Sequence, residues 1–169
     1  MTLSTAFPAP RPALAGLAFW LVFTLAFAAV AGYASAQAGS FYLQLVRPSW
    51  APPGWLFGPV WAVLYLLMAG AAWLVWREAG LRRGAWALGL YAAQLAANAL
   101  WTWLFFVWHQ GGWAMAEIVL LWALIAATIG LFARHRRLAA ALLLPYLAWV
   151  SFACVLTWAC WRLNPGLLG

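Results

Sequence analysis

Five long apolar runs constrain what this chain can fold into more than any other feature of its sequence. They cover residues 14–37, 57–77, 84–108, 113–133 and 138–161. An α-helix needs about 20 apolar residues to cross a hydrocarbon layer of about 30 Å, and each run is near that length. We therefore predict an all-α fold in which residues 1–169 form a single integral membrane domain with five transmembrane helices.

The composition excludes a soluble protein. Hydrophobic residues make up 69% of the chain and charged residues only 7%, whereas a soluble domain carries about a quarter charged residues. The net charge of +7 comes from nine basic residues, all arginine. In a soluble chain this excess would suggest a nucleic-acid partner, but here the arginines lie between the apolar runs. They indicate membrane topology, and we expect no nucleic-acid partner.

The arginines are distributed unequally between the two sides of the predicted membrane domain. Those on the side of the N-terminus are Arg11, Arg77, Arg82, Arg83, Arg134, Arg136 and Arg137. Only Arg47 and Arg162 fall on the other side. The positive-inside rule then predicts a cytoplasmic N-terminus, with the first loop and the C-terminus in the periplasm or exterior. We expect the inner membrane of a bacterium, where helical bundles predominate.

The first run also allows a second interpretation. Arg11, the run itself and the sequence ASAQ at 34–37 resemble a signal peptide with an A-x-A cleavage site. The run is longer than the core of a usual signal peptide. Cleavage of the first run remains an alternative to a retained first helix.

Polar residues interrupt the third run at a spacing of four: Gln94, Asn98 and Thr102. At helical periodicity they share one stripe with Tyr91, Trp101 and Phe105. Polar side chains in a membrane helix face a neighbouring helix or a cavity rather than lipid. The stripe therefore predicts either interhelical hydrogen bonds or the wall of a ligand pocket, and both remain open at this point.

Depth in the membrane favours the pocket. With a rise of about 1.5 Å per residue, Asn98 and Trp101 lie roughly 15 Å and 10 Å below the outer end of their run. Trp61 lies about 6 Å and Trp149 about 18 Å below the outer ends of theirs. Aromatic and amide groups from several helices thus share the outer half of the bilayer, beneath the long first loop at 38–56. We predict a pocket there, with this loop as its lid.

Three segments resemble the translocator protein / tryptophan-rich sensory protein family, also called the peripheral-type benzodiazepine receptor family. RPSWAPPGWLFGPVWAVLY at 47–65 is similar to the family's Pro- and Trp-rich loop and second helix. YAAQLAANALWTWLFF at 91–106 is similar to its third-helix signature, and LLLPYLAWVSFACVLTWACWRLN at 142–164 to its fifth helix. The five runs and the overall length agree, so the resemblance covers nearly the whole chain and suggests a bacterial member.

The resemblance implies a five-helix bundle whose pocket binds porphyrins such as protoporphyrin IX and haem, as well as benzodiazepine-type ligands. It also implies a homodimer, with no obligatory cofactor and no metal site. The pocket residues that it implies are Tyr42, Trp50, Trp61, Asn98, Trp101, Trp149 and Ala153. Trp158 and Ala159 stand where animal members carry the tyrosines of a cholesterol motif, so recognition of cholesterol through that motif is not implied.

These observations lead us to expect a membrane receptor or carrier for porphyrins, acting in tetrapyrrole sensing, regulation or transport. The alternative is an enzyme that degrades porphyrins with light and oxygen, in which Trp61 and Trp149 would be the catalytic, redox-active groups. The sequence carries no nucleophile–base pair, paired metal ligands or nucleotide loop. A transporter built from inverted repeats is disfavoured, since five runs do not divide into equal halves.

Overall fold

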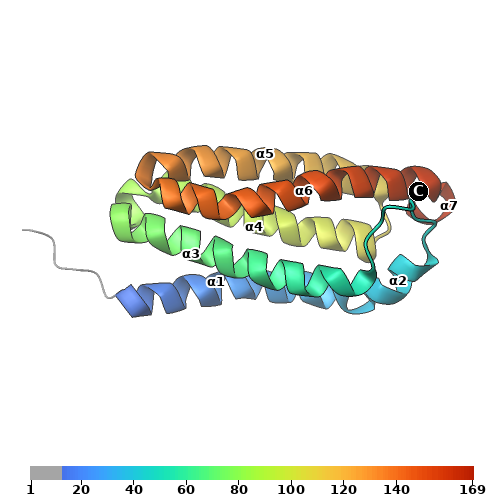
Figure 1. The fold of residues 1–169 in the computed structure, drawn as a ribbon, viewed down its shortest axis with the longest axis horizontal. Coiled ribbons are helices and arrows are strands. Elements are labelled where there is room, and N and C mark those ends of the chain that lie inside the picture. The colour runs from blue at the N-terminus through green and yellow to red at the C-terminus, as the bar shows by residue number, and fades with distance from the viewer. Residues whose placement is uncertain (1–12) are drawn as a thin grey trace, which may run out of the picture.

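Five long helices form a single bundle in the computed structural model, which describes residues 13–169, with Gln37 described through its backbone only (Figure 1). These helices are α1 (Ala13–Ala34), α3 (Phe57–Arg83), α4 (Ala85–Phe106), α5 (Gly111–His135) and α6 (Arg137–Leu163). The predicted all-α fold with five long helices is confirmed.

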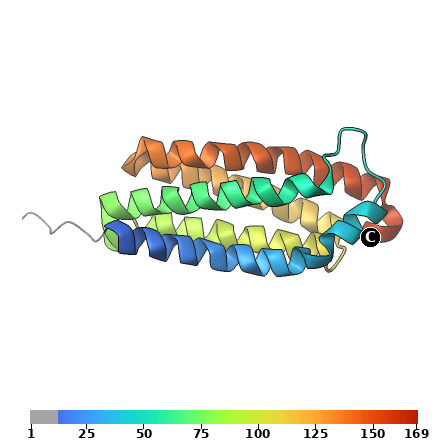
Figure 2. The ribbon, with the colours of Figure 1, turned by 60° about the horizontal axis from the view of Figure 1, so that its bottom comes forward.

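The predicted first loop contains secondary structure of its own. After α1 the chain continues through a 3-10 helix (η1, Ser35–Gln37) into a short helix (α2, Ala38–Gln44), and a second 3-10 helix (η2, Gly54–Leu56) leads into α3. Together with the C-terminal helix α7 (Pro165–Leu168), these elements cover one end of the bundle (Figure 2). We call residues 38–56 the lid.

Four helical segments of the described chain are long and apolar enough to span a membrane: Ala13–Ala34, Gly54–Arg83, Gly111–His135 and Arg137–Leu163. Helix α4 is 22 residues long, the same length as α1, but it is less apolar than α1. It carries Gln94 and Asn98 and is rich in tryptophan. It nevertheless lies alongside the other four in the bundle, with its polar side chains buried. The chain is an integral membrane protein.

The connections at the arginine-rich end are shorter than the sequence suggested. Helix α3 continues beyond residue 77 to Arg83, with a break at Gly80, whose φ of 70° is readily adopted only by glycine. Between α5 and α6 only Arg136 is extended, with φ −156° and ψ 116°. Both linkers are therefore largely helical, and helix ends that reach water at the membrane surface can carry these charges at little cost.

The helices pack in a closed circuit in which α1 contacts α3, α3 contacts α6, α6 contacts α5, α5 contacts α4 and α4 contacts α1. Buried side chains fill the centre, among them Met68, Leu95 and Tyr146. The hydroxyls of Thr24 and Tyr91 lie 2.6 Å apart and join α1 to α4. This order places α1, α3, α4 and α6 around one interior space at the lid end.

The described arginines gather as the sequence predicted. Six of them lie where α3 meets α4 and α5 meets α6: Arg77, Arg82, Arg83, Arg134, Arg136 and Arg137. Arg47 and Arg162 lie at the lid end. Arg11, which also entered the topology prediction and the signal-peptide alternative, lies outside the described residues. The charge difference between the two ends is a property of the fold, and Glu78 offsets it only weakly through an exposed contact of 3.8 Å with Arg136.

Candidate functional site

A cavity of about 440 Å³ lies inside the bundle beneath the lid. Side chains of α1, α2, α3, α4 and α6 form its wall. Seven of them are aromatic: Tyr42, Phe57, Trp61, Tyr65, Trp101, Phe106 and Trp149. Volumes of this order, with mostly apolar walls and a few polar groups, are typical of small-molecule sites.

Six of the seven predicted pocket residues line this cavity. Tyr42 comes from α2, Trp61 from α3, Asn98 and Trp101 from α4, and Trp149 and Ala153 from α6. Residues that lie far apart in sequence therefore converge on one space. Whether a ligand contacts them remains a prediction.

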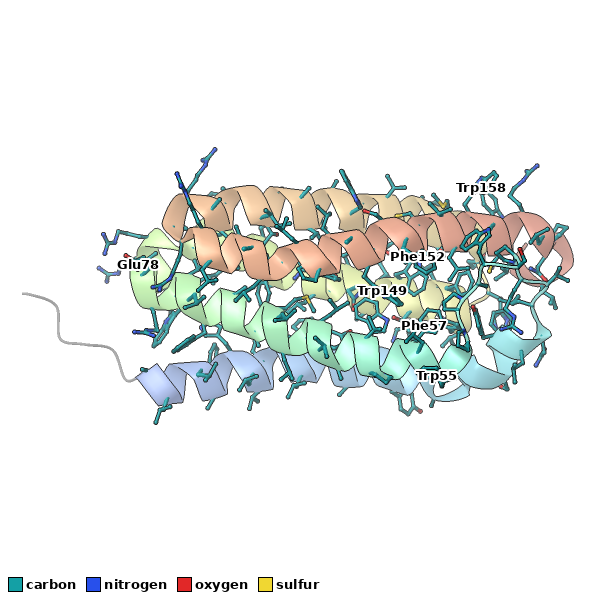
Figure 3. The ribbon with its side chains drawn as sticks, viewed as in Figure 1. Trp55, Phe57, Glu78, Trp149, Phe152 and Trp158 are labelled. Carbon is teal, nitrogen blue, oxygen red and sulfur yellow. The ribbon has the colours of Figure 1, made fainter. Side chains whose placement is uncertain are left out.

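Trp50 is placed differently. Its side chain is 48% exposed and packs edge-on against Phe152, with ring centroids 5.9 Å apart. The ring centroid of Phe152 in turn lies 5.6 Å from that of Trp149, and Phe152 is not part of the cavity wall. Both residues are labelled on α6 in Figure 3. Trp50 thus lies outside the cavity wall. It contacts Phe152, and Phe152 contacts the wall residue Trp149.

Two aromatic residues of the wall were not singled out from the sequence. Phe57 packs edge-on against Trp149 with ring centroids 5.8 Å apart, and the ring of Tyr65 lies 5.5 Å from that of Trp61. Phe57 and Trp149 are labelled near each other in Figure 3. Phe57, Trp61 and Tyr65 follow one another at a spacing of four, which puts them on one face of α3. That spacing was the signal that could have found them.

The amide of Asn98 is the central polar group of the site. Its side chain is only 2% exposed, and its Oδ1 accepts a hydrogen bond of 2.7 Å from the hydroxyl of Tyr65. Because Oδ1 is engaged in this way, Nδ2 is the atom through which Asn98 would meet an acceptor on a ligand. Thr102, which also lines the cavity, donates to the backbone carbonyl of Asn98 at 3.2 Å.

The sequence allowed two explanations for the polar stripe of α4, interhelical hydrogen bonds or the wall of a pocket, and its residues differ in which of them applies. Asn98 and Thr102 line the cavity, and Asn98 also bonds to Tyr65 on α3, so both explanations apply to this residue. Gln94, one turn deeper, is 1% exposed, and neither of its amide atoms has a hydrogen-bond partner among the described residues. The stripe therefore contributes to the site through its outer half only.

The lid is fastened to the bundle by Asn164, which follows α6. Its Oδ1 accepts from the backbone N–H of Val46 at 2.8 Å, and its Nδ2 donates to the carbonyl of Val46 at 2.9 Å. The same Nδ2 donates to the carbonyl of Cys160 at 2.7 Å. A two-way amide–backbone contact of this kind fixes the lid against the end of α6.

Tyr42 gives the lid a second, internal bond. Its hydroxyl donates to the carbonyl of Pro52 at 2.9 Å, and the guanidinium of Arg47 lies 4.7 Å from the centre of its ring. Burial raises the pKa of the Tyr42 phenol above its ordinary value of 10.0, although a hydrogen bond with Arg47 acts in the opposite direction. The hydroxyl therefore keeps its proton, and remains a donor, throughout the physiological pH range.

The fold and the cavity define an integral membrane protein whose helices enclose an aromatic chamber of the size of a small-molecule site. The chain belongs to the TspO/MBR family, whose model matches residues 18–162. The translocator proteins of Sus scrofa and Homo sapiens are each 43% identical to it over 131 residues, which is 76% of this chain and 78% of each relative. The tryptophan-rich protein TspO of Chlorobaculum tepidum is 41% identical over 129 residues, 74% of this chain and 80% of that protein.

Proposed function

We propose that the cavity binds porphyrins such as protoporphyrin IX and haem, and that the protein acts as a membrane receptor or carrier in tetrapyrrole sensing, regulation or transport. The observation that carries this proposal is the convergence of Trp61, Trp101 and Trp149 with Asn98 on one enclosed space. A large flat apolar ring suits aromatic walls, and a small number of polar groups would set its orientation.

The geometry suggests a role for each group. Trp61 on α3 and Trp149 on α6 would offer their rings from neighbouring helices, and Asn98 would offer the hydrogens of its Nδ2. Arg47 lies over Tyr42 at the lid side of the cavity, where its charge would pair with a propionate of the porphyrin. An apolar body inside and a charged edge at the lid match the amphipathic character of a dicarboxylic porphyrin.

Quenching of tryptophan fluorescence by protoporphyrin IX tests this proposal. We expect saturable quenching, and about a tenfold or greater loss of affinity in the double variant Trp61→Phe/Trp149→Phe, since aromatic contacts contribute about 0.5–1.5 kcal/mol each beyond their burial. Trp86→Phe is the matched control, because Trp86 is 88% exposed at the arginine-rich end. Equal affinities of the double variant and the control would refute the site.

The enzymatic alternative places the same two tryptophans in contact with the bound porphyrin. Both line the cavity, so oxidation of a photoexcited porphyrin by oxygen would take place beside them. Illumination of the protein with protoporphyrin IX in air, followed by absorption spectroscopy, separates reaction from binding. A loss of the porphyrin spectrum that depends on Trp61 and Trp149, under conditions where binding is saturated, would support an enzyme.

The proposal includes the orientation and assembly expected from the sequence. The lid and the C-terminus face the periplasm of a bacterial cell and the arginine-rich end faces the cytoplasm, which agrees with the difference in charge between the two ends. A homodimer would use the outer face of α4, where the small residues Gly89, Ala93 and Ala96 are exposed and allow close helix approach. The mass of the particle in mild detergent tests the dimer.

A further inference from the structure

The exposed residues of its described wall indicate where the cavity reaches the surface of the protein. Five residues of the described wall are both part of the cavity and exposed: Gly32, Gly39, Gly54, Gly58 and Ala62. All five are glycine or alanine, and all lie on α1, α2 or the segment from η2 into α3. The wall residues contributed by α4 and α6 are buried or half-buried. We call this opening the α1–α3 slot.

Space inside the slot is open rather than filled by neighbouring side chains. A Cβ atom added to Gly32, Gly39 or Gly58 would meet no other atom within 4 Å. At Gly54 the nearest atom would be Cδ1 of Tyr42, at 3.7 Å. On α3 the slot runs from Gly58 to Ala62, which is about 6 Å along the helix axis at about 1.5 Å per residue.

The seam between α1 and α3 is closed further down. There the ring of Trp76 lies on Gly16 so closely that an added Cβ would collide with it. Trp73 donates from Nε1 to the carbonyl of Ala13 at 2.9 Å. The two helices are therefore joined tightly at the arginine-rich end, whereas beside the cavity the facing residues of the slot are small and exposed.

Two other routes into the cavity are closed by contacts. The lid is held by Asn164 on Val46 and by Tyr42 on Pro52. On the opposite side, a surface groove of about 660 Å³ runs between α3 and α6, and the ring of Trp149 separates it from the cavity. Phe57 packs against that ring at 5.8 Å and blocks its displacement. Entry by either route would require bonds or ring contacts to break.

We propose that the ligand enters from the hydrocarbon layer of the membrane, edge-on through the α1–α3 slot. This inference rests on the proposed function and assigns an access route to the same cavity. The rim consists of glycine and alanine and carries no charge, so an apolar ring already dissolved in the bilayer loses no hydration as it passes. Gly39 and Gly54 are lid residues at the edge of the slot. The rest of the lid, by this inference, covers the cavity and does not admit the ligand.

The test is the rate of protoporphyrin IX binding to the full chain in phosphatidylcholine nanodiscs, followed by stopped-flow quenching of tryptophan fluorescence. Ala62→Phe places a ring in the slot, and we expect the association and dissociation rate constants to fall together by tenfold or more. An obstruction at an entrance raises the barrier equally in both directions, so the dissociation constant should move far less than either rate. Gly32→Phe obstructs the slot from α1 and gives an independent second variant.

Two controls address the closed routes. Ala148→Phe fills the α3–α6 groove without reaching the cavity, and Asn164→Ala releases the lid; both should leave the binding rates unchanged. Unchanged rates in both slot variants, with binding retained, would overturn the slot as the route. Faster association in Asn164→Ala would identify the lid as the entrance and would also overturn it. Absence of saturable binding in the unmodified chain would refute the proposed function itself.

Discussion

At the scale of single residues, Gly111 lies in such close contact with its neighbours that a larger side chain does not fit there. Gly111 begins α5, where the ring of Trp161 and the carbonyl oxygen of Leu168 approach its backbone. An added Cβ would collide with the ring and lie 2.8 Å from that oxygen. Glycine at this position lets the turn between α4 and α5 pack directly on the ends of α6 and α7, which support the lid.

Gly111→Ala should therefore destabilise the protein, by about 1–3 kcal/mol as for other overpacked sites. Gly130→Ala is the matched control in the same helix, because an added Cβ there meets nothing within 4 Å. Alanine is the better helix former, so the control should gain about 0.5–1 kcal/mol. Thermal unfolding in detergent, followed by circular dichroism, measures both. A Gly111→Ala variant as stable as Gly130→Ala would contradict this account of the turn.

At the scale of elements, side-chain contacts hold the lid to the helix bundle. Its short helix α2 contributes Tyr42 to the cavity and Phe41 to a stack on His109, with ring centroids 4.1 Å apart. Asn164 supplies the hydrogen bonds that hold Val46. Few backbone groups of the lid are protected by regular helices, so its local stability depends on these side-chain bonds.

Asn164→Ala should increase amide hydrogen exchange across residues 45–53, while exchange in α3, α5 and α6 stays slow. The reason is that the two bonds to Val46 are lost, whereas the bundle loses only the bond from Asn164 Nδ2 to the carbonyl of Cys160 near the end of α6. Hydrogen-exchange mass spectrometry in nanodiscs measures the difference. Arg162→Ala, at the same end of α6, is the control expected to leave the lid protected. Equal protection in Asn164→Ala and the unmodified chain would show that other contacts hold the lid.

At the scale of the whole molecule, the distribution of charge predicts the orientation in the membrane. Six of the described arginines gather at the end where α3 meets α4 and α5 meets α6, against two at the lid end. Arginines in short loops next to membrane helices are retained on the cytoplasmic side, and this bias sets the topology of the chain. In the proposed orientation, the lid and the slot lie in the outer half of the bilayer.

Alkaline phosphatase, which is active only in the periplasm, should be active when it is fused after Gly169. Green fluorescent protein, which fluoresces only in the cytoplasm, should fluoresce when it is inserted beside Gly84, between α3 and α4. Replacing Arg82, Arg83, Arg136 and Arg137 by glutamine should produce molecules of mixed orientation, because little of the charge bias then remains. Phosphatase activity at Gly84 in the unmodified chain would reverse the proposed topology.

The sequence by itself determined the five helices and the faces that they bury. Apolar runs near membrane length select helices because the bilayer leaves no other partner for backbone polar groups. The spacing of Gln94, Asn98 and Thr102 placed all three on a buried stripe, and all three are buried. The family resemblance implied seven pocket residues, of which six line the cavity: two on α4 and four on α2, α3 and α6. Local composition and periodicity carry this information because they act within one helix.

Only the tertiary structure decided which buried residues share a void. Periodicity fixes the face of a helix but not its rotation and depth relative to its neighbours, so it could not separate Asn98, which lines the cavity, from Gln94, which does not. The family resemblance implied Trp50 as a pocket residue, whereas the fold packs its ring against Phe152, outside the cavity wall. The α1–α3 slot has no signature within either helix, since it arises from small residues on two helices that meet only when the bundle is assembled.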